Sequence, residues 1–280
     1  MVGTQQLTDR VILELADRRI AIDLGQAQDI SIPVQFQGES FRAFGADPAT
    51  SSPYRVGSFQ MSVDKGAGCN CHLFSFSAHL HGTHTECVGH ISTQEYILQD
   101  LVNPRPFTLA LVISLDPKPG NQCSESYQPA IQDEDLVLTQ ESLQDVLQAL
   151  GSPKDFDALI VRTLPNDPKK KTRDYSSVPP PYFSNEAMSY IKQLGVRHLL
   201  VDTPSVDRLK DDGLLSNHHL FWCVEHGSND VPIPSDKSIT EFVFVPSEWQ
   251  DGLCLLSLNI SNIRSDAAPS RPTLYRMEET

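Results

Sequence analysis

The middle third of the sequence alternates strand and helix patterns, and this alternation limits the folds that the chain can adopt. The segment FTLALVISLD (107–116) is a nearly continuous apolar run, as expected for a strand that is buried on both faces. A helical pattern follows at 138–151, a strand at 157–163, a second helix at 184–195 and a further strand at 196–204. Strand, helix and strand in succession predict an α/β fold with parallel strand pairs.

The ends of both helical patterns carry the signals expected of helix termini. Thr139 and Ser184 are suited to cap the N-termini, because a side-chain hydroxyl can accept a hydrogen bond from a backbone N–H of the first turn. Gly151 and Gly195 stand where the two patterns end, as is common at helix C-termini. We therefore expect two helices that end close to these four residues.

The other strand-like segments are not separated by clear helices. They are RRIAIDL (18–24) near the start, and EFVFVPSEW (241–249) and GLCLLSLNI (252–260) in the last third. The alternation therefore does not extend through the whole chain, and we predict an α/β fold with a mixed-sheet, barrel-like core. The Pro-rich stretches NPRPF, VPPPYF and VPIPSDK are short, as loops are, so we expect a single domain spanning residues 1–280.

Composition and charge exclude several kinds of partner. The chain has 280 residues and a formal net charge of −14, so it should repel both nucleic acid and anionic lipid. Its basic run at 169–173 is typical of a solvated loop. The N-terminal MVGTQQLTDRVILELADRR lacks the basic start and apolar core of a signal peptide, and no apolar run is long enough to span a bilayer. With six scattered cysteines, these features predict a cytoplasmic protein with reduced thiols.

The segment HLHGTHTECVGH (79–90) concentrates groups that bind metals. It holds four of the nine histidines of the chain, together with the carboxylate of Glu86. Imidazole and carboxylate are good ligands for zinc, manganese and iron. His84 and Glu86 fall on the same side of an extended segment, because side chains alternate along a strand. His90 can return toward them across a turn at Gly89. The segment therefore predicts a metal site.

This segment resembles the signature H-x-G-T-H-x-D-x-P-x-H of the cyclase-like metal-dependent hydrolases, a family that includes bacterial kynurenine formamidase and isatin hydrolase. The chain reads L-H-G-T-H-T-E-C-V-G-H over the same positions, and Glu86 stands at the family's bridging aspartate. The resemblance continues in order through the downstream stretches VDTPSVD, NHHLFW, ITEFVFV and DAAPSRP. The residues at the family's functional positions are Thr83, His84, Glu86, His90, His218 (favoured over His219), Glu241 and Arg271.

The sequence departs from the family signature at the first histidine, where Leu80 stands between His79 and His81. Either one of these two neighbours takes the place of the ligand, or the ligand is missing. A one-residue shift along a strand turns a side chain to the other face, so both possibilities stay open. Glu86 is one methylene longer than aspartate, and Val88 replaces a proline. Whether the site holds one metal or two also stays open.

The resemblance implies a swivelling β/β/α-type domain that forms a homodimer or homotetramer and hydrolyses an amide, cyclic amide or ester of a small molecule. The implied ligands of one zinc or manganese ion are His84, Glu86, His218 and Glu241. The metal would lower the pKa of a bound water that attacks the carbonyl, and His90 would act as the general base. Thr83 would orient a ligand through a hydrogen bond.

Two other classes of function are compatible with the same residues. One is a metal-dependent lyase or dehydratase on this scaffold, since a metal and a histidine can also eliminate water. The other is a non-catalytic protein that has lost the metal, and Leu80 is the feature that favours it. The sequence contains no G-x-S-x-G elbow, so a serine hydrolase has little support.

Overall fold

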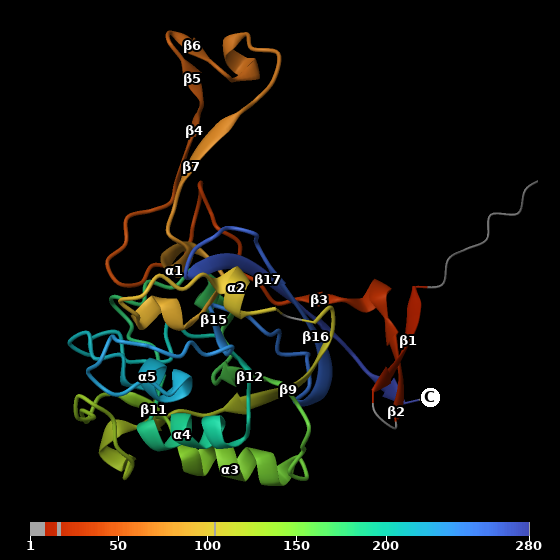
Figure 1. Ribbon diagram of the computed structural model, residues 1–280, viewed down its shortest axis with the longest axis vertical. Coiled ribbons are helices and arrows are strands. Elements are labelled where there is room, and N and C mark those ends of the chain that lie inside the picture. The colour runs from red at the N-terminus through yellow and green to blue at the C-terminus, as the bar shows by residue number, and fades with distance from the viewer. Residues whose placement is uncertain (1–8, 16–17, 104, 280) are drawn as a thin grey trace, which may run out of the picture.

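The computed structural model describes residues 9–15, 18–103 and 105–279, and its centre is a closed barrel of seven strands (Figure 1). These strands are β8 (His84–Glu86), β9 (Thr108–Leu115), β12 (Ala158–Thr163), β14 (His198–Val201), β15 (Ser238–Glu241), β16 (Gly252–Ile260) and β17 (Ala267–Tyr275). They are ordered β16-β9-β12-β14-β15-β8-β17, and β16 closes the ring by pairing with β17. The run from β9 to β15 is parallel and the other pairs are antiparallel. The predicted α/β fold with a mixed-sheet, barrel-like core is confirmed.

Helices pack against the outside of the parallel part of the barrel. They are α3 (Gln140–Ala149), α4 (Asn185–Gln193) and α5 (Ser216–Trp222). In β9, Leu111 and Ile113 belong to the core cluster beneath these helices, whereas Ala110 and Val112 belong to the cluster that fills the barrel. The predicted strand at 107–116 is therefore buried on both faces, as its apolar run indicated.

Both predicted helices begin and end as their terminal residues indicated. The hydroxyls of Thr139 and Ser184 accept hydrogen bonds from backbone N–H groups in the first turns of α3 and α4. Gly151 and Gly195, just beyond the last turns, have φ angles of 79° and 78°. This left-handed backbone favours glycine and ends each helix.

The strand predicted at 241–249 is wrong in its position. β15 ends at Glu241, and the next residue, Phe242, has a φ of 58°, which breaks the strand. The apolar side chains at 242–245 still alternate, between the barrel interior and an outer cluster that contains Phe41. The alternation therefore arises from a loop that is buried on two sides. A strand gives the same period-two pattern, so the pattern alone does not distinguish the two.

Two extensions leave the barrel (Figure 1). A small sheet, ordered β1-β2-β18, joins the two ends of the described chain, and β2 confirms the strand predicted at 18–24. A ribbon, here called the arm (residues 50–75), stands away from the barrel and leads into α1, the short helix Ala78–His81. The elements of these extensions are β1 (Arg10–Leu15), β2 (Arg18–Asp23), β18 (Glu278–Glu279), β4 (Thr50–Pro53), β5 (Arg55–Val56), β6 (Phe59–Gln60) and β7 (His72–Ser75).

Shorter elements complete the part of the chain that the structure describes. They are β3 (Gln28–Asp29), α2 (Leu98–Leu101), β10 (Lys118–Pro119), β11 (Leu136–Leu138) and β13 (Tyr182–Phe183). Among the described helices, none combines the length and the apolar character that a bilayer span requires. Residues 1–8 of the N-terminal segment, where no signal peptide is expected, lie outside the described residues.

A buried arginine ties the barrel strands to the loop that precedes β16. The Arg162 guanidinium donates to the Asp251 carboxylate at 2.8 Å, to the Ser114 hydroxyl at 2.8 Å, and to the carbonyls of Pro246 and Trp249 at 2.7 and 2.9 Å. This side chain is buried, so each acceptor loses water when it binds the guanidinium. Removing the guanidinium would leave a carboxylate and two carbonyls without their partner.

We expect Arg162→Met to lower the free energy of unfolding by about 3 kcal/mol or more, because it breaks a buried pair from one side. Arg197→Met is the matched control, since Arg197 pairs with Asp236 where both side chains are about half exposed. The control should cost less than about 1 kcal/mol. Chemical denaturation measures both variants, and equal losses would contradict the structural role of Arg162.

Candidate metal centre

The candidate centre lies on the outer face of the barrel, where β8 and β15 pair. His84 and Glu86 project to the same side of β8, as the sequence predicted, and Glu241 of β15 stands directly opposite His84 in the ladder. The intervening Thr85 points the other way, where its hydroxyl lies 2.8 Å from that of Thr240. Strand alternation and register thus place two carboxylates and an imidazole on one face.

His84 is fully buried and is held in one tautomer. Its Nδ1 lies 3.1 Å from the carbonyl of Gly82, so Nδ1 carries the proton and Nε2 presents a lone pair. Nε2 lies 3.5 Å from Oε2 of Glu241 and 4.0 Å from Oε2 of Glu86. Burial lowers the pKa of His84 to about 4, which keeps the imidazole neutral at neutral pH. A neutral imidazole is the form that binds a metal.

His218 reaches the same cluster from α5. Its Nε2 lies 3.0 Å from Oε1 of Glu86 and 3.8 Å from Oε1 of Glu241, while Nδ1 lies 2.5 Å from Oδ2 of Asp207. The neighbouring His219 turns away, with Nδ1 3.0 Å from the carbonyl of Glu225. The structure therefore brings His218, not His219, to the predicted site.

Asp207 is a functional residue that the sequence did not single out. Its carboxylate accepts hydrogen bonds from the backbone N–H groups of Asn217 and His218 at 2.8 and 3.2 Å. Asp207 therefore caps α5 and at the same time orients the His218 ring on that helix. The hydroxyl of Tyr127 donates to its other oxygen at 2.9 Å. The available signal was its place at the end of VDTPSVD, a stretch that resembles the family.

His79 takes the position near the cluster that Leu80 cannot fill. Its Nδ1 lies 3.0 Å from Oε2 of Glu86, and its Nε2 lies 2.9 Å from Oδ2 of Asp266. His81 points elsewhere, with Nε2 2.8 Å from the carbonyl of Asp47. Burial lowers the pKa of His79, but the carboxylates of Asp266 and Glu86 outweigh it and raise this pKa to about 10. Asp266 is the second functional residue that the sequence did not single out.

His90 lies at the open edge of the cluster, on the 3-10 turn Val88–Ile91. Its ring stacks on that of His79 with centroids 4.3 Å apart, and its Nδ1 lies 3.9 Å from Oε2 of Glu86 and 3.7 Å from Oδ2 of Asp266. Gly89 permits this turn, because a Cβ there would come within 2.4 Å of the Tyr96 carbonyl oxygen.

Thr83 contacts none of the clustered histidines or carboxylates through its side chain. Its hydroxyl accepts the backbone N–H of Ile32 at 2.6 Å and donates to the carbonyl of Phe242. Phe242 has the left-handed backbone that follows Glu241, so Thr83 fixes the segment that carries this carboxylate. Thr83 thus acts on the backbone beside a candidate ligand and not on the ligand itself.

The two buried carboxylates of the cluster cannot both carry uncompensated charge. Burial would raise the pKa of Glu86, but the surrounding imidazoles, His90 foremost, hold it well below its usual range. Burial and the nearby charge of Glu86 raise the pKa of Glu241 well above its usual range. A bound cation would allow Glu241 to ionise as well, because it supplies the missing positive charge.

A divalent metal fits the residues that are present. Among the described residues, buried Nε2 of His84 and Oε2 of Glu86 have no hydrogen-bond partner; His79 approaches that oxygen at ion-pair distance without hydrogen-bond geometry. Ligand atoms of His84, Glu86 and Glu241 lie within 4.8 Å of one another. Buried polar atoms without a partner cost free energy, which a bound cation would recover. Together with His218, the cluster offers two imidazoles and two carboxylates, a set that suits zinc or manganese.

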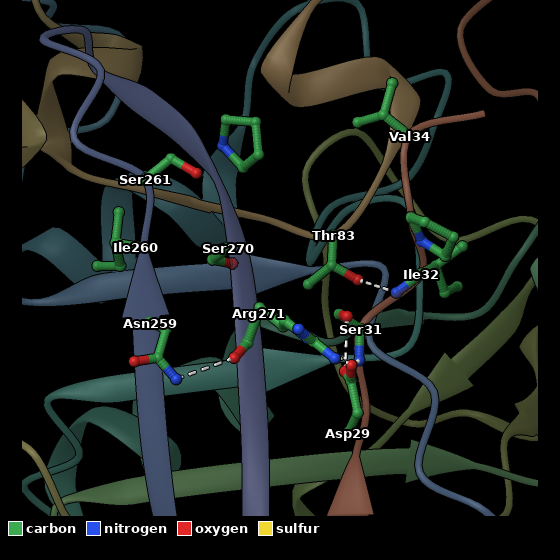
Figure 2. A pocket seen from close by; sticks show the side chains of 12 residues that line it. Asp29, Ser31, Ile32, Val34, Thr83, Asn259, Ile260, Ser261, Ser270 and Arg271 are labelled. Atoms are coloured by element: carbon green, nitrogen blue, oxygen red, sulfur yellow. Dashed lines mark hydrogen bonds and ion pairs between the residues drawn. The ribbon is translucent and has the colours of Figure 1, made fainter. Parts of the chain in front are cut away.

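A cavity of about 520 Å³ lies between the segments that carry Ser31, Thr83 and Arg271 (Figure 2). Thr83 lines it, whereas none of the clustered histidines or glutamates does. Arg271, which stands at the family's closing arginine, lies at this cavity and donates to Asp29 at 2.7 Å (Figure 2). Arg271 is therefore placed away from the metal ligands and is held by a different carboxylate.

Comparisons with known proteins identify the family and the fold. Residues 22–208 match the model of the family described as "Putative cyclase". No curated protein matches the chain in sequence. The structure resembles isatin hydrolase A from Labrenzia aggregata, bound to benzyl benzoate, with a TM-score of 0.61 and 14% identity over 90% of this chain and 94% of that chain.

Two further solved structures are similar. Isatin hydrolase A from Ralstonia solanacearum has a TM-score of 0.61 and 15% identity over 89% of this chain and 91% of that chain. A predicted metal-dependent hydrolase from Bacillus stearothermophilus has a TM-score of 0.54 and 14% identity over 89% of this chain and 98% of that chain. At such identities the likeness shows a shared fold.

We expect the purified chain to retain about one equivalent of zinc or manganese after dialysis, since ligand atoms of His84, Glu86 and Glu241 lie within 4.8 Å of one another beside His218. His218→Ala should lose this metal, because Nε2 of His218 faces both carboxylates. His219→Ala is the matched control on the same helix and should keep it. Binding should weaken at about pH 5, since protons compete for the imidazoles. No metal in the unaltered chain, or equal loss from both variants, would contradict the assignment.

Proposed function

The chain belongs to the cyclase family, and on that premise we propose that it is a metal-dependent hydrolase of an amide, a cyclic amide or an ester of a small molecule. One observation carries the proposal. Two buried atoms that can bind a metal, Nε2 of His84 and Oε2 of Glu86, face the cluster without a hydrogen-bond partner among the described residues. Most buried polar side-chain atoms in proteins have a hydrogen-bond partner, so two unpaired atoms that face the same point favour a bound cation between them.

The residues that would hold the metal are His84, Glu86, His218 and Glu241. When bound, a zinc or manganese ion lowers the pKa of a coordinated water and polarises a carbonyl oxygen. The chain's own groups fix the ligand geometry before binding: the Gly82 carbonyl and the Asp207 carboxylate each receive one ring N–H, which turns the opposite nitrogen toward Glu86 and Glu241.

His90 is placed to move the proton. Its side chain is 28% exposed, whereas those of His84, Glu86 and His218 are at most 2% exposed, so a substrate can reach the centre from the side of His90. Its Nδ1 faces Glu86 Oε2 at 3.9 Å. A neutral His90 at this edge can take a proton from the attacking water and return it to the leaving nitrogen or oxygen.

The complete donor set favours an enzyme over a non-catalytic protein. Leu80 was the feature that suggested a lost ligand, yet the His79 imidazole lies beside Glu86 in its place. Isatin hydrolase and metal-dependent hydrolase are the named activities of similar structures. Those names support hydrolysis as the reaction to test first.

The arm supports the proposal that the chain forms a homodimer or homotetramer. Val56, Phe59, Leu73 and Phe74 of the arm are each more than half exposed. A two-stranded ribbon is only marginally stable alone in water, and exposed apolar patches usually mark contact surfaces. A second copy of the chain would cover these side chains.

We expect light scattering after size-exclusion chromatography to give a dimer or tetramer mass, and the double substitution Leu73→Ser, Phe74→Ser to shift it toward the monomer. Both side chains lie on β7 and are 61% and 53% exposed, so their replacement removes apolar contact area and leaves the barrel core intact. Replacing Val178, which is 52% exposed outside the arm, by serine is the control and should keep the assembly. A monomeric unaltered chain would contradict the proposal.

We expect His90→Ala to keep its metal and to lose turnover by about a hundred- to ten-thousand-fold, as is typical when a general base is removed. Added imidazole should restore part of the rate. Turnover is measured on a panel of aryl formamides, cyclic amides, lactones and hydroxy acids, and metal content is measured in parallel. Glu86→Gln should lose both metal and turnover, because the Glu86 carboxylate lies within 4.0 Å of all four histidines of the cluster.

Two results would overturn this account in different ways. A metal-free His90→Ala variant would make His90 a ligand and not the base. Dehydration of a hydroxy acid, without hydrolysis of any amide or ester on the panel, would favour the lyase alternative.

A further inference from the structure

The cavity at Ser31, Thr83 and Arg271 has the size and the lining of a small-molecule site (Figure 2). Its volume of about 520 Å³ lies within the range of about 300–1,000 Å³ that is usual for such sites. Apolar walls with a few polar groups are typical of ligand pockets. Much of this wall is apolar and consists of Ile32, Pro33, Val34, Ile260 and Pro269. The hydrolysis proposed above does not use this cavity.

One wall of the cavity is formed before any ligand binds. The Thr83 hydroxyl accepts the backbone N–H of Ile32 at 2.6 Å, and this hydrogen bond ties the wall to the residue that precedes β8. Gly82 allows the same close approach, because a Cβ there would come within 2.9 Å of Val34. A wall that is already ordered loses little conformational entropy when a ligand binds.

The polar end of the cavity is an arginine with free donors. Arg271 lies on β17, opposite Asn259 of β16, and its side chain reaches across to Asp29 (Figure 2). This contact uses Nε, which lies 2.7 Å from Oδ2 of Asp29. Among the described residues, neither Nη atom of Arg271 has a hydrogen-bond partner, and the side chain is 75% exposed. Donors of one planar group are therefore available to an oxygen atom of a ligand.

The charge of Arg271 is already balanced by Asp29. Burial would raise the pKa of Asp29, but hydrogen bonds from Ser31 and the contact with Arg271 outweigh this effect and lower the pKa. Ser31 donates to Oδ1 of Asp29 through its hydroxyl at 2.6 Å and through its backbone N–H at 2.9 Å. A ligand carboxylate would stand near this ionised group in a chain of net charge −14, and like charges repel. The arrangement therefore favours an uncharged acceptor.

We propose that this cavity binds an uncharged small molecule with an apolar body and a carbonyl oxygen, and that the Nη groups of Arg271 donate to this oxygen. The apolar body would lie against Ile32, Val34 and Ile260. None of the histidines and glutamates of the metal centre lines the cavity, so the site is distinct from that centre and needs no metal. Its existence does not rest on the proposed function.

The test compares benzophenone, an uncharged ketone that has no amide or ester bond to cleave, with two compounds of similar shape. Diphenylmethane lacks the carbonyl oxygen, and 4-benzoylbenzoate adds a carboxylate. Equilibrium dialysis measures the binding of each compound to the purified chain. We expect benzophenone to bind about tenfold more tightly than diphenylmethane, which is the factor expected for one hydrogen bond from a charged donor. Benzophenone should also bind more tightly than 4-benzoylbenzoate.

Three substitutions test the residues of the cavity. Arg271→Met keeps the aliphatic stem and removes the donors, so benzophenone and diphenylmethane should bind this variant about equally. Arg276→Met is the matched control, because Arg276 follows the same strand but contacts Glu248 and Trp249, and it should keep the preference for the ketone. Ser261→Trp adds a large side chain at an exposed position of the cavity wall and should weaken the binding of benzophenone about tenfold. Circular dichroism of each variant confirms that it is folded.

Photochemical labelling shows where the ketone lies. Irradiated benzophenone bonds to nearby C–H groups, so mass spectrometry should find it on peptides that contain Val34 or Ile260. Labelling of the arm alone, or unchanged binding by Ser261→Trp, overturns the site. Equal affinity of the unaltered chain for benzophenone and diphenylmethane overturns the role of Arg271, and tighter binding of 4-benzoylbenzoate overturns the choice of an uncharged ligand.

The metal-free variant His218→Ala separates this inference from the proposed function. It should bind benzophenone as the unaltered chain does, because the cavity shares no residue with the metal ligands. Loss of binding in this variant would place the ketone at the metal centre and overturn the inference. Failure of the proposed function looks different: no amide or ester is cleaved, and benzophenone still binds.

Discussion

The site depends on a carboxylate that is wholly buried and must be compensated. An ionised carboxylate without water is costly, and Glu86 meets this cost with imidazoles that come from separate parts of the chain. His218 arrives on α5, His79 on α1, and His90 on the turn that follows β8. Glu241 then adds a second carboxylate across the ladder. Burial and the charge of Glu86 raise the pKa of Glu241 well above its usual range, and this excess of carboxylates favours a bound cation over a closed ion-pair network.

Two aspartates orient the histidines that reach the cluster from helices: Asp207 orients His218 and Asp266 orients His79. Asp207 receives Nδ1 of His218, and Asp266 receives Nε2 of His79, so the two rings present opposite nitrogens to the two oxygens of Glu86. Each carboxylate is also anchored by the chain around it, Asp207 through backbone N–H groups of α5 and Asp266 through Ser265. The rings are therefore oriented before any cation arrives, which reduces the conformational entropy that metal binding must overcome.

The sequence predicted what depends on local pattern. His84 and Glu86 follow from strand alternation, and the helix ends follow from Thr139 and Ser184, because in each case the cause lies within a few residues. Asp266 could not be found this way, since its partner His79 is 187 residues distant. The strand placed at 241–249 failed for a related reason: the left-handed Phe242 is stabilised by Thr83, whose hydroxyl comes from a different strand segment.

Helix geometry explains why His79, and not Leu80 or His81, contacts Glu86. In a strand, moving a histidine by one residue would turn it to the opposite face, but the residues before Gly82 form the helical turn α1, in which successive side chains are about 100° apart. His79 and His81 consequently point in different directions, and the first alone meets Glu86. Gly82 fixes the end of this turn, because a Cβ there would come within 2.9 Å of Val34. The family signature predicts a histidine at position 80, where this chain has leucine, but the helical turn brings the imidazole of the preceding residue, His79, to Glu86.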